Sequence, residues 1–179
     1  FNLLCIVPDG RGGDVPDEVY QEALGYCVQR RAMLIVDPKA GWSVSTAQSG
    51  VPAMNLNGDM ARNAAIYFPR IRQADPQLGG LVETFVPCGI IAGVMARTDT
   101  QRGVWKAPAG TEADLRGIVG LEYRMSDGEN GITNPRAVNT LRIFPNGIVN
   151  WGGRTNDGDD DFGSEYKYIP IRRLALYIE

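Results

Sequence analysis

Two short segments of this 179-residue chain are almost entirely apolar, and they constrain its fold more than any other feature. Residues 1–8 (FNLLCIVP) form the first segment and residues 33–36 (MLIV) the second. An apolar run without alternation is typical of a strand that is covered on both faces. Between the two runs, apolar residues recur at helical spacing, namely Val19, Ala23, Tyr26 and Cys27. A strand, a helix and a second strand in this order predict two parallel strands joined by a right-handed crossover.

The rest of the chain continues this alternation. We expect further strands at residues 64–68, 115–119, 140–144 and 148–151, with a turn at residues 145–147 and an extended pairing at residues 168–171. Helices are expected at residues 43–50, 87–95 and from Arg173 onward, with a short helix or turn at residues 126–131. This order predicts a single α/β domain over residues 1–179, in which helices flank both faces of a mostly parallel central sheet.

The composition narrows the class of protein. Apolar residues make up 44% of the chain and charged residues 22%, which excludes disordered and fibrous classes. The net charge is −3, and no run of Lys and Arg exceeds two residues, so direct nucleic-acid binding is not expected. The chain has neither a signal peptide nor an apolar run of about 18 residues, so we expect no membrane insertion.

The chain contains no histidine, which excludes many catalytic sites. Ser-His-Asp triads, Cys-His pairs and His-based metal centres are impossible within it. The three cysteines, Cys5, Cys27 and Cys88, form no CxxC motif, so a zinc site is not supported. Any disulfide pairing would leave one of them over, so a reducing compartment is the simpler interpretation.

The loop at residues 9–13 (DGRGG) lies where a phosphate-binding turn would lie, between a strand and a helix. It matches neither GxGxxG nor GxxxxGK[ST], and Asp14 would place a negative charge next to the phosphate. We therefore interpret it as a tight turn, with Asp14 placed to cap the helix and Pro16 in the first helical turn.

Asp9 and Asp37 each follow a predicted buried strand, so both are expected at the carboxyl edge of the sheet. Two carboxylates at that edge could hold Mg²⁺. No third ligand at a characteristic spacing supports the metal, and each Asp also precedes a turn residue, Gly10 or Pro38. Turn formation is the simpler role for both.

Two further features allow two interpretations each, and a third allows one. Residues 157–161 (DGDDD) resemble a calcium loop but lack its alternating ligands and distal Glu, which favours a solvated surface loop that could meet a basic patch on a neighbouring subunit. Trp105 lies in a segment bounded by Gly and Pro, so it either fills the core or anchors an interface, and the core is slightly favoured. Trp151, before two glycines, is expected in the core at a strand end.

Three segments of the second half resemble the sheath proteins of contractile phage tails. They are residues 97–110 (RTDTQRGVWKAPAG), 130–154 (NGITNPRAVNTLRIFPNGIVNWGGR) and 166–179 (YKYIPIRRLALYIE). The similarity is firm from about Ala61 onward and looser before it.

This resemblance implies a subtilisin-like architecture without protease chemistry. It also implies a structural subunit that polymerises as stacked hexameric rings around a tail tube, above a baseplate, and contracts to drive the tube through the host envelope. Strand exchange between subunits is expected, and no catalytic, cofactor-binding or metal-binding residues are implied. The location implied is the phage tail of the virion, assembled in the bacterial cytoplasm. Relative to a whole sheath protein, the C-terminal domain and the terminal arms are missing, so we expect the chain to be one domain of a longer polypeptide.

Two alternatives remain open. The chain could belong to the sheath of an R-type bacteriocin or of a contractile injection system, because these machines share the same mechanical unit. It could instead be an α/β enzyme that uses Asp9 and Asp37 with a metal, although the missing histidine and phosphate loop count against this.

Overall fold

A five-stranded sheet in the order β1-β2-β3-β7-β8 forms the centre of the computed structural model, which describes residues 2–158 and 164–178. Its strands are β1 (Leu3–Cys5), β2 (Met33–Val36), β3 (Ala64–Phe68), β7 (Val138–Phe144) and β8 (Gly147–Asn150). The first four strands run parallel, and β8 pairs antiparallel with β7. The predicted mostly parallel α/β sheet is therefore confirmed.

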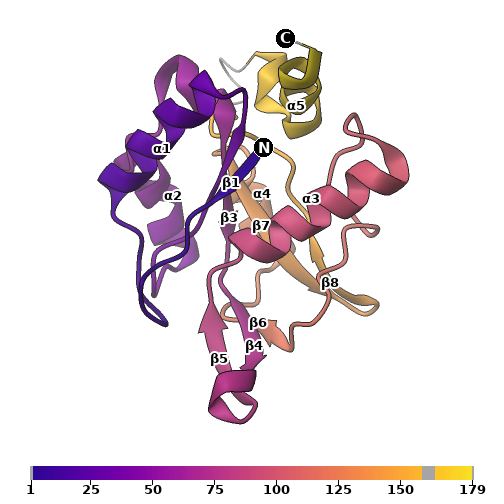
Figure 1. Ribbon diagram of the computed structural model, residues 1–179. Helices are drawn as coiled ribbons and strands as arrows, with labels where there is room; N and C mark the ends of the chain where they lie inside the picture. Colours follow the sequence, from indigo (N-terminus) through magenta and orange to yellow (C-terminus); the bar gives the residue numbers. More distant parts are fainter. Residues whose placement is uncertain (1, 159–163, 179) are drawn as a thin grey trace.

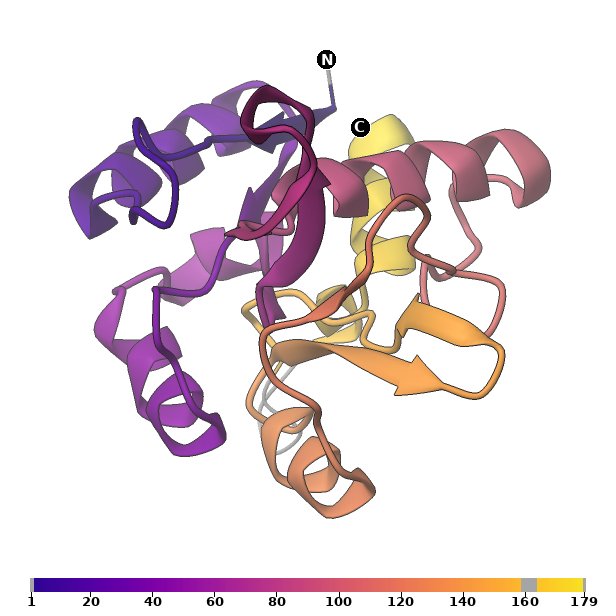
Figure 2. The ribbon, with the colours of Figure 1, turned by 90° about the horizontal axis from the view of Figure 1, so that it is seen from below.

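Helices cover both faces of this sheet, as predicted (Figures 1 and 2). On one face, α1 (Asp17–Gln29) packs with Tyr20, Leu24 and Cys27 in a cluster that includes Leu34 and Ile66 of the strands. α2 (Val44–Ala53) borders the same side of the sheet. The other face carries α3 (Cys88–Arg102) and α5 (Ile169–Ile178).

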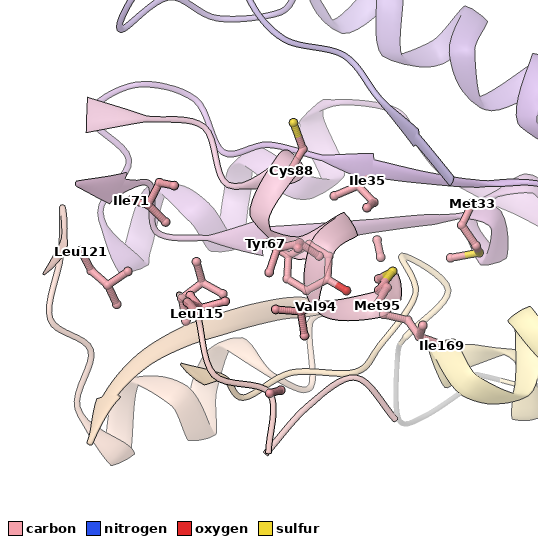
Figure 3. Packing of buried hydrophobic residues seen from close by; sticks show 14 of the residues in the cluster. Met33, Ile35, Tyr67, Ile71, Cys88, Val94, Met95, Leu115, Leu121 and Ile169 are labelled. Atoms are coloured by element: carbon pink, nitrogen blue, oxygen red, sulfur yellow. The ribbon is translucent and has the colours of Figure 1, made fainter. Parts of the chain in front are cut away.

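The second face holds the larger apolar cluster (Figure 3). It joins Met33 and Ile35 of β2 and Tyr67 of β3 to Val94 and Met95 of α3. Alternate residues of β2 and β3 thus enter opposite clusters, and every residue of both strands is buried. This double burial is the physical reason why their sequences are apolar without alternation.

A second, smaller sheet was not predicted. It has the order β5-β4-β6 and consists of β4 (Ile71–Asp75), β5 (Leu81–Phe85) and β6 (Gly120–Leu121), all antiparallel. A short 3₁₀ helix, Pro76–Leu78, connects β4 to β5. Three of the five residues of β4 are exposed, so the sequence carries no core-facing pattern that would reveal these strands.

Local chemistry explains the shorter helices. Ser43 caps α2 in a capping box with Thr46, and Ser126 caps α4 (Asp127–Thr133) in a capping box with Glu129. Both helices occur where the sequence predicts them. The chain also turns between β7 and β8 at Pro145 and Asn146, as expected. The remaining regular elements are the 3₁₀ helices Gly58–Asn63 and Glu165–Lys167.

Several predicted details are wrong. Asp14 does not cap α1, because its carboxylate accepts a hydrogen bond from Ala40 and pairs with Arg70 instead. Residues 115–119 form no strand, although Leu115 donates a backbone hydrogen bond to Ile148 of β8. The pairing expected at residues 168–171 is limited to one bridge, between Arg154 and Tyr168.

Two predicted helices are longer than expected. α3 continues to Arg102 instead of ending at Met95, and α5 begins at Ile169 rather than at Arg173.

Candidate assembly surface

The loop that follows β1 is a tight turn held in place by one buried arginine. The amide of Gly13 donates to the carbonyl of Gly10 at 3.1 Å, and Gly12 has a positive φ of 69°. Arg70, whose side chain is 2% exposed, donates to the carbonyls of Gly12 and Gly13 and pairs with Asp14. These contacts hold the loop against the rest of the domain, as the interpretation of a tight turn predicts.

The two carboxylates at the carboxyl edge of the sheet have different environments. Asp9 is exposed, whereas Asp37 is 3% exposed and accepts the backbone N–H of Cys88 at 2.8 Å. The hydroxyl of Tyr20 lies 3.5 Å from the Asp37 carboxylate and accepts the Asp37 amide. Burial raises the pKa of Asp37 from 3.8 to about 6, although Cys88, Arg70 and Tyr20 oppose the shift. Among the described residues, no group of three or more His, Cys, Asp or Glu side chains could hold a metal ion.

The acidic segment at residues 157–161 lies mostly outside the described residues. The structure describes only Asp157 and Gly158 of this segment. The Asp157 carboxylate accepts from Ser164 at 3.4 Å, and Arg154 donates to the carbonyl of Gly158 at 2.9 Å.

Two tryptophans expected in the core lie at the surface. Trp105 is 67% exposed, so the prediction of a core residue is wrong and the alternative, an interface anchor, gains support. Trp151 is 38% exposed and packs against Phe144 with ring centroids 4.7 Å apart. It is therefore a partly covered surface residue.

Trp105 lines a groove of about 550 Å³ between α3, α5 and the end of α1. Tyr177, 82% exposed, lines the same groove together with the exposed basic residues Arg30 and Arg31. The buried guanidinium of Arg173 makes two hydrogen bonds to Asp99 in the groove lining, at 2.9 and 2.6 Å. Exposed aromatic rings beside arginines are typical of protein–protein interfaces.

The free edge of β5 forms a second surface. β5 pairs with β4 on one side, and no other strand of the described chain joins it. Its first residues, Leu81 and Val82, are 63% and 43% exposed. A cleft of about 860 Å³ lies beside this sheet and is lined by β4, by Thr84 and Phe85 at the end of β5, and by the loop of residues 7–12. An open strand edge with exposed apolar residues can accept a further strand.

The sequence does not mark Leu81, Val82 or Tyr177 as candidates. The β5 edge carries no recognisable motif, since its properties follow from its position at the end of a sheet. Tyr177 belongs to the apolar run at residues 174–178, in which Leu176 is buried and Tyr177 is exposed. The helical period of this run is the signal that could have distinguished the two residues.

None of the helices in the described ranges, residues 2–158 and 164–178, is long and apolar enough to cross a membrane.

Comparison with known proteins identifies relatives among solved contractile machines. The chain is 30% identical to a chain of the helical sheath of the anti-feeding prophage in its contracted state, over 90% of its own length, with a TM-score of 0.66. It is 28% identical to a chain of the contracted baseplate of the anti-feeding prophage, over 99% of its length, with a TM-score of 0.70. The sheath of an extracellular contractile injection system, PVC, gives 29% identity over 82% and a TM-score of 0.63.

The coverage of these relatives is partial. The chain spans 42%, 46% and 38% of the three matched chains, respectively. No family model matches the chain, and no curated protein matches it significantly. The sequence similarity and the fold similarity nevertheless both extend over most of the chain. The chain therefore belongs to the contractile tail sheath protein family, as its three sequence segments predicted.

Proposed function

We propose that this chain is a domain of a sheath subunit that polymerises as stacked hexameric rings around a tail tube. Contraction of the polymer would drive the tube through the envelope of a target cell. The observation that carries the proposal is the 30% identity, over 90% of the chain, to a helical sheath solved in its contracted state. Because the chain spans 42% of that relative, the assembly is proposed for the complete polypeptide.

The surface of the domain suits such a polymer. Stacked rings need heterologous contacts, in which two different patches of neighbouring copies meet. The Trp105 groove and the β5 edge are two different patches, and the β5 edge could accept a strand from a neighbour. Contraction is then a rigid-body rearrangement between two packings of the subunits, with the extended packing metastable. The free energy for contraction is stored in the interfaces, so the mechanism requires neither a nucleotide nor a metal.

The proposal also concerns the type of contractile machine to which the subunit belongs. The relatives at 28–30% identity come from the anti-feeding prophage and an extracellular contractile injection system. This favours a contractile injection system over a phage tail or an R-type bacteriocin. Capsid genes beside the gene for this protein would point to a phage, and toxin genes without capsid genes would point to an injection system or a bacteriocin.

The enzymatic alternative has weaker support. Asp37 is buried and already accepts the N–H that begins α3, so it is poorly placed to bind a metal with the exposed Asp9. Soaking with Mg²⁺ and isothermal calorimetry would test it directly. Binding of Mg²⁺ to the wild type that is lost in both Asp9→Asn and Asp37→Asn would support the enzymatic alternative.

Electron microscopy of the complete gene product, with and without its tube protein, tests the main proposal. We expect hollow striated cylinders or stacked rings, formed more readily when the tube is present. A dispersed monomer at high concentration under both conditions would contradict polymer assembly.

Substitution of Trp105 tests whether the groove is an assembly contact. Trp105→Ser should leave the fold intact, because the ring is 67% exposed, and should reduce the amount of polymer that sediments. Trp151→Ser makes the same chemical change at another surface position and serves as the control. Equal polymer yields from both variants would show that the groove makes no contact.

A further inference from the structure

Three reactive side chains from distant parts of the sequence meet at the carboxyl edge of the main sheet. Cys5 ends β1, Asp37 follows β2, and Cys88 is the first residue of α3. The Cys5 thiol donates to the carbonyl oxygen of Cys88 at 3.4 Å. The Asp37 carboxylate accepts the Cys88 amide at 2.8 Å. Figure 3 shows the sulfur of Cys88 pointing away from Tyr67 and Val94, which belong to the same buried cluster as Cys88.

The two thiols differ in accessibility and in acidity. Cys5 is half-buried, whereas Cys88 is fully buried. A hydrogen bond from the Cys88 side chain lowers the pKa of Cys5, which makes Cys5 the more easily ionised thiol. The same bond, together with burial and the nearby Asp37 carboxylate, raises the pKa of Cys88. Since the thiolate is the nucleophile, Cys5 is the thiol suited to attack first.

Cys27 provides an internal comparison. It is fully buried in the cluster on the opposite face of the sheet, and burial raises its pKa to about 11. It is therefore less accessible than Cys5.

We propose that Cys5 and Cys88 form a redox-active thiol pair that reacts with small disulfides such as glutathione disulfide, with Asp37 as the proton acceptor for Cys88. The proposal is independent of assembly into a sheath, because all three side chains belong to one domain.

The first step forms a mixed disulfide at Cys5. The Cys5 thiolate attacks one sulfur of glutathione disulfide, a new sulfur–sulfur bond forms, and the bond between the two glutathiones breaks. One glutathione leaves as a thiolate and takes up the proton that Cys5 released to water.

The second step closes the internal disulfide. Cys88 transfers its thiol proton to the Asp37 carboxylate, and its sulfur attacks the sulfur of Cys5 in the mixed disulfide. The second glutathione leaves as a thiolate and receives a proton, which Asp37 returns through solvent. The two protein thiols are thus oxidised by two electrons, and glutathione disulfide is reduced to two molecules of glutathione.

The internal disulfide would join the edge strand β1 to α3 and close a loop between residues that are 83 positions apart. Such a closure restricts the unfolded chain, so the oxidised protein should melt at a higher temperature than the reduced protein.

Peptide mass spectrometry after incubation with glutathione disulfide tests the pair. In the wild type we expect a Cys5–Cys88 linked peptide, while Cys27 stays free. In Cys88→Ser the reaction should stop at Cys5 carrying one glutathione, and in Cys5→Ser neither Cys88 nor Cys27 should react. Three free thiols in the wild type at all ratios of oxidised to reduced glutathione would overturn the proposal, as would a linkage to Cys27.

Asp37→Asn tests the proton acceptor separately. The amide oxygen of Asn can still accept the Cys88 N–H, so circular dichroism should show an intact fold. We expect the mixed disulfide at Cys5 to form at the wild-type rate, but to convert to the internal disulfide about a hundredfold more slowly. An unchanged rate of conversion would overturn the role of Asp37.

Discussion

Arg70 shows how much of this fold depends on a single side chain. Its guanidinium donates to the carbonyls of Gly12, Gly13 and Pro38 and pairs with Asp14, while only 2% of the side chain is exposed. It thereby connects the loop after β1 and the turn after β2 to the end of β3. Buried carbonyls without partners are costly, so this one residue stabilises two loops at once.

We expect Arg70→Met to lower the free energy of unfolding by about 3 kcal/mol, because the carbonyls would lose this donor and the Asp14 carboxylate would lose its cationic partner. Urea denaturation followed by circular dichroism measures the change. Arg72→Met, at an exposed position of β4, is the matched control and should change stability by less than about 0.5 kcal/mol. Equal effects of the two substitutions would contradict this role of Arg70.

The buried carboxylate of Asp37 predicts a pH dependence of stability. Its pKa is about 6 in the folded protein and 3.8 ordinarily, so the folded state binds this proton more tightly than the unfolded state. The stabilisation is fully present below pH 3.8 and is lost as the pH rises through about 6.

Between about pH 7 and pH 4, we expect the wild type to gain about 2 kcal/mol relative to Asp37→Asn. Urea denaturation of both proteins at several pH values measures the difference, and the comparison cancels the titration of all other carboxylates. Parallel pH profiles of the two proteins would show that Asp37 is not the responsible group.

At the scale of the element, β4 and β5 are the clearest case of structure without a sequence pattern. Their strands pair over five residues from Ile71↔Phe85 to Asp75↔Leu81, yet three residues of β4 and two of β5 are exposed and only two of the ten are buried. α2 and α4 are the opposite case, because each begins with a capping box written in adjacent residues. Elements that depend on local hydrogen bonds were therefore predictable, and a solvated hairpin was not.

The edge of β5 gives a prediction about assembly. Val82→Lys should leave the monomer folded, because Val82 is 43% exposed, but should reduce the polymer formed by the complete gene product. A charged side chain on a strand edge disfavours the addition of another strand. Met60→Lys, at a 45% exposed position of the Gly58–Asn63 helix, is the control. Electron microscopy and sedimentation measure polymer, and a normal yield from Val82→Lys would exclude β5 as a contact.

At the scale of the whole molecule, β2 and β3 connect the two larger apolar clusters. Ile66 of β3 packs into the cluster with α1, and its neighbour Tyr67 packs into the cluster with α3 and α5. Loss of packing on one face therefore displaces a strand on which the other face depends. This arrangement predicts that residues 1–179 unfold as one unit, in line with the single domain that the sequence predicts.

Ile66→Ala tests this cooperativity. We expect a loss of about 3 kcal/mol in the free energy of unfolding, with a single transition. Near-ultraviolet and far-ultraviolet circular dichroism should give the same midpoint, and hydrogen exchange should accelerate in both α1 and α3. Acceleration confined to α1 would show that the two faces are separate folding units.

The sequence by itself determined the buried strands β2 and β3, the helix between β1 and β2, the caps of α2 and α4, and the family. These features are written in short runs of residues, in which apolar spacing and side-chain hydrogen bonds act over a few positions. Only the tertiary structure decided the partners of Arg70, the exposure of Trp105, the open edge of β5 and the meeting of Cys5 with Cys88. Cys5 and Cys88 are 83 positions apart, and Arg70 and Gly13 are 57 apart. Contacts over such separations arise from the packing of whole elements against one another, which no local pattern encodes.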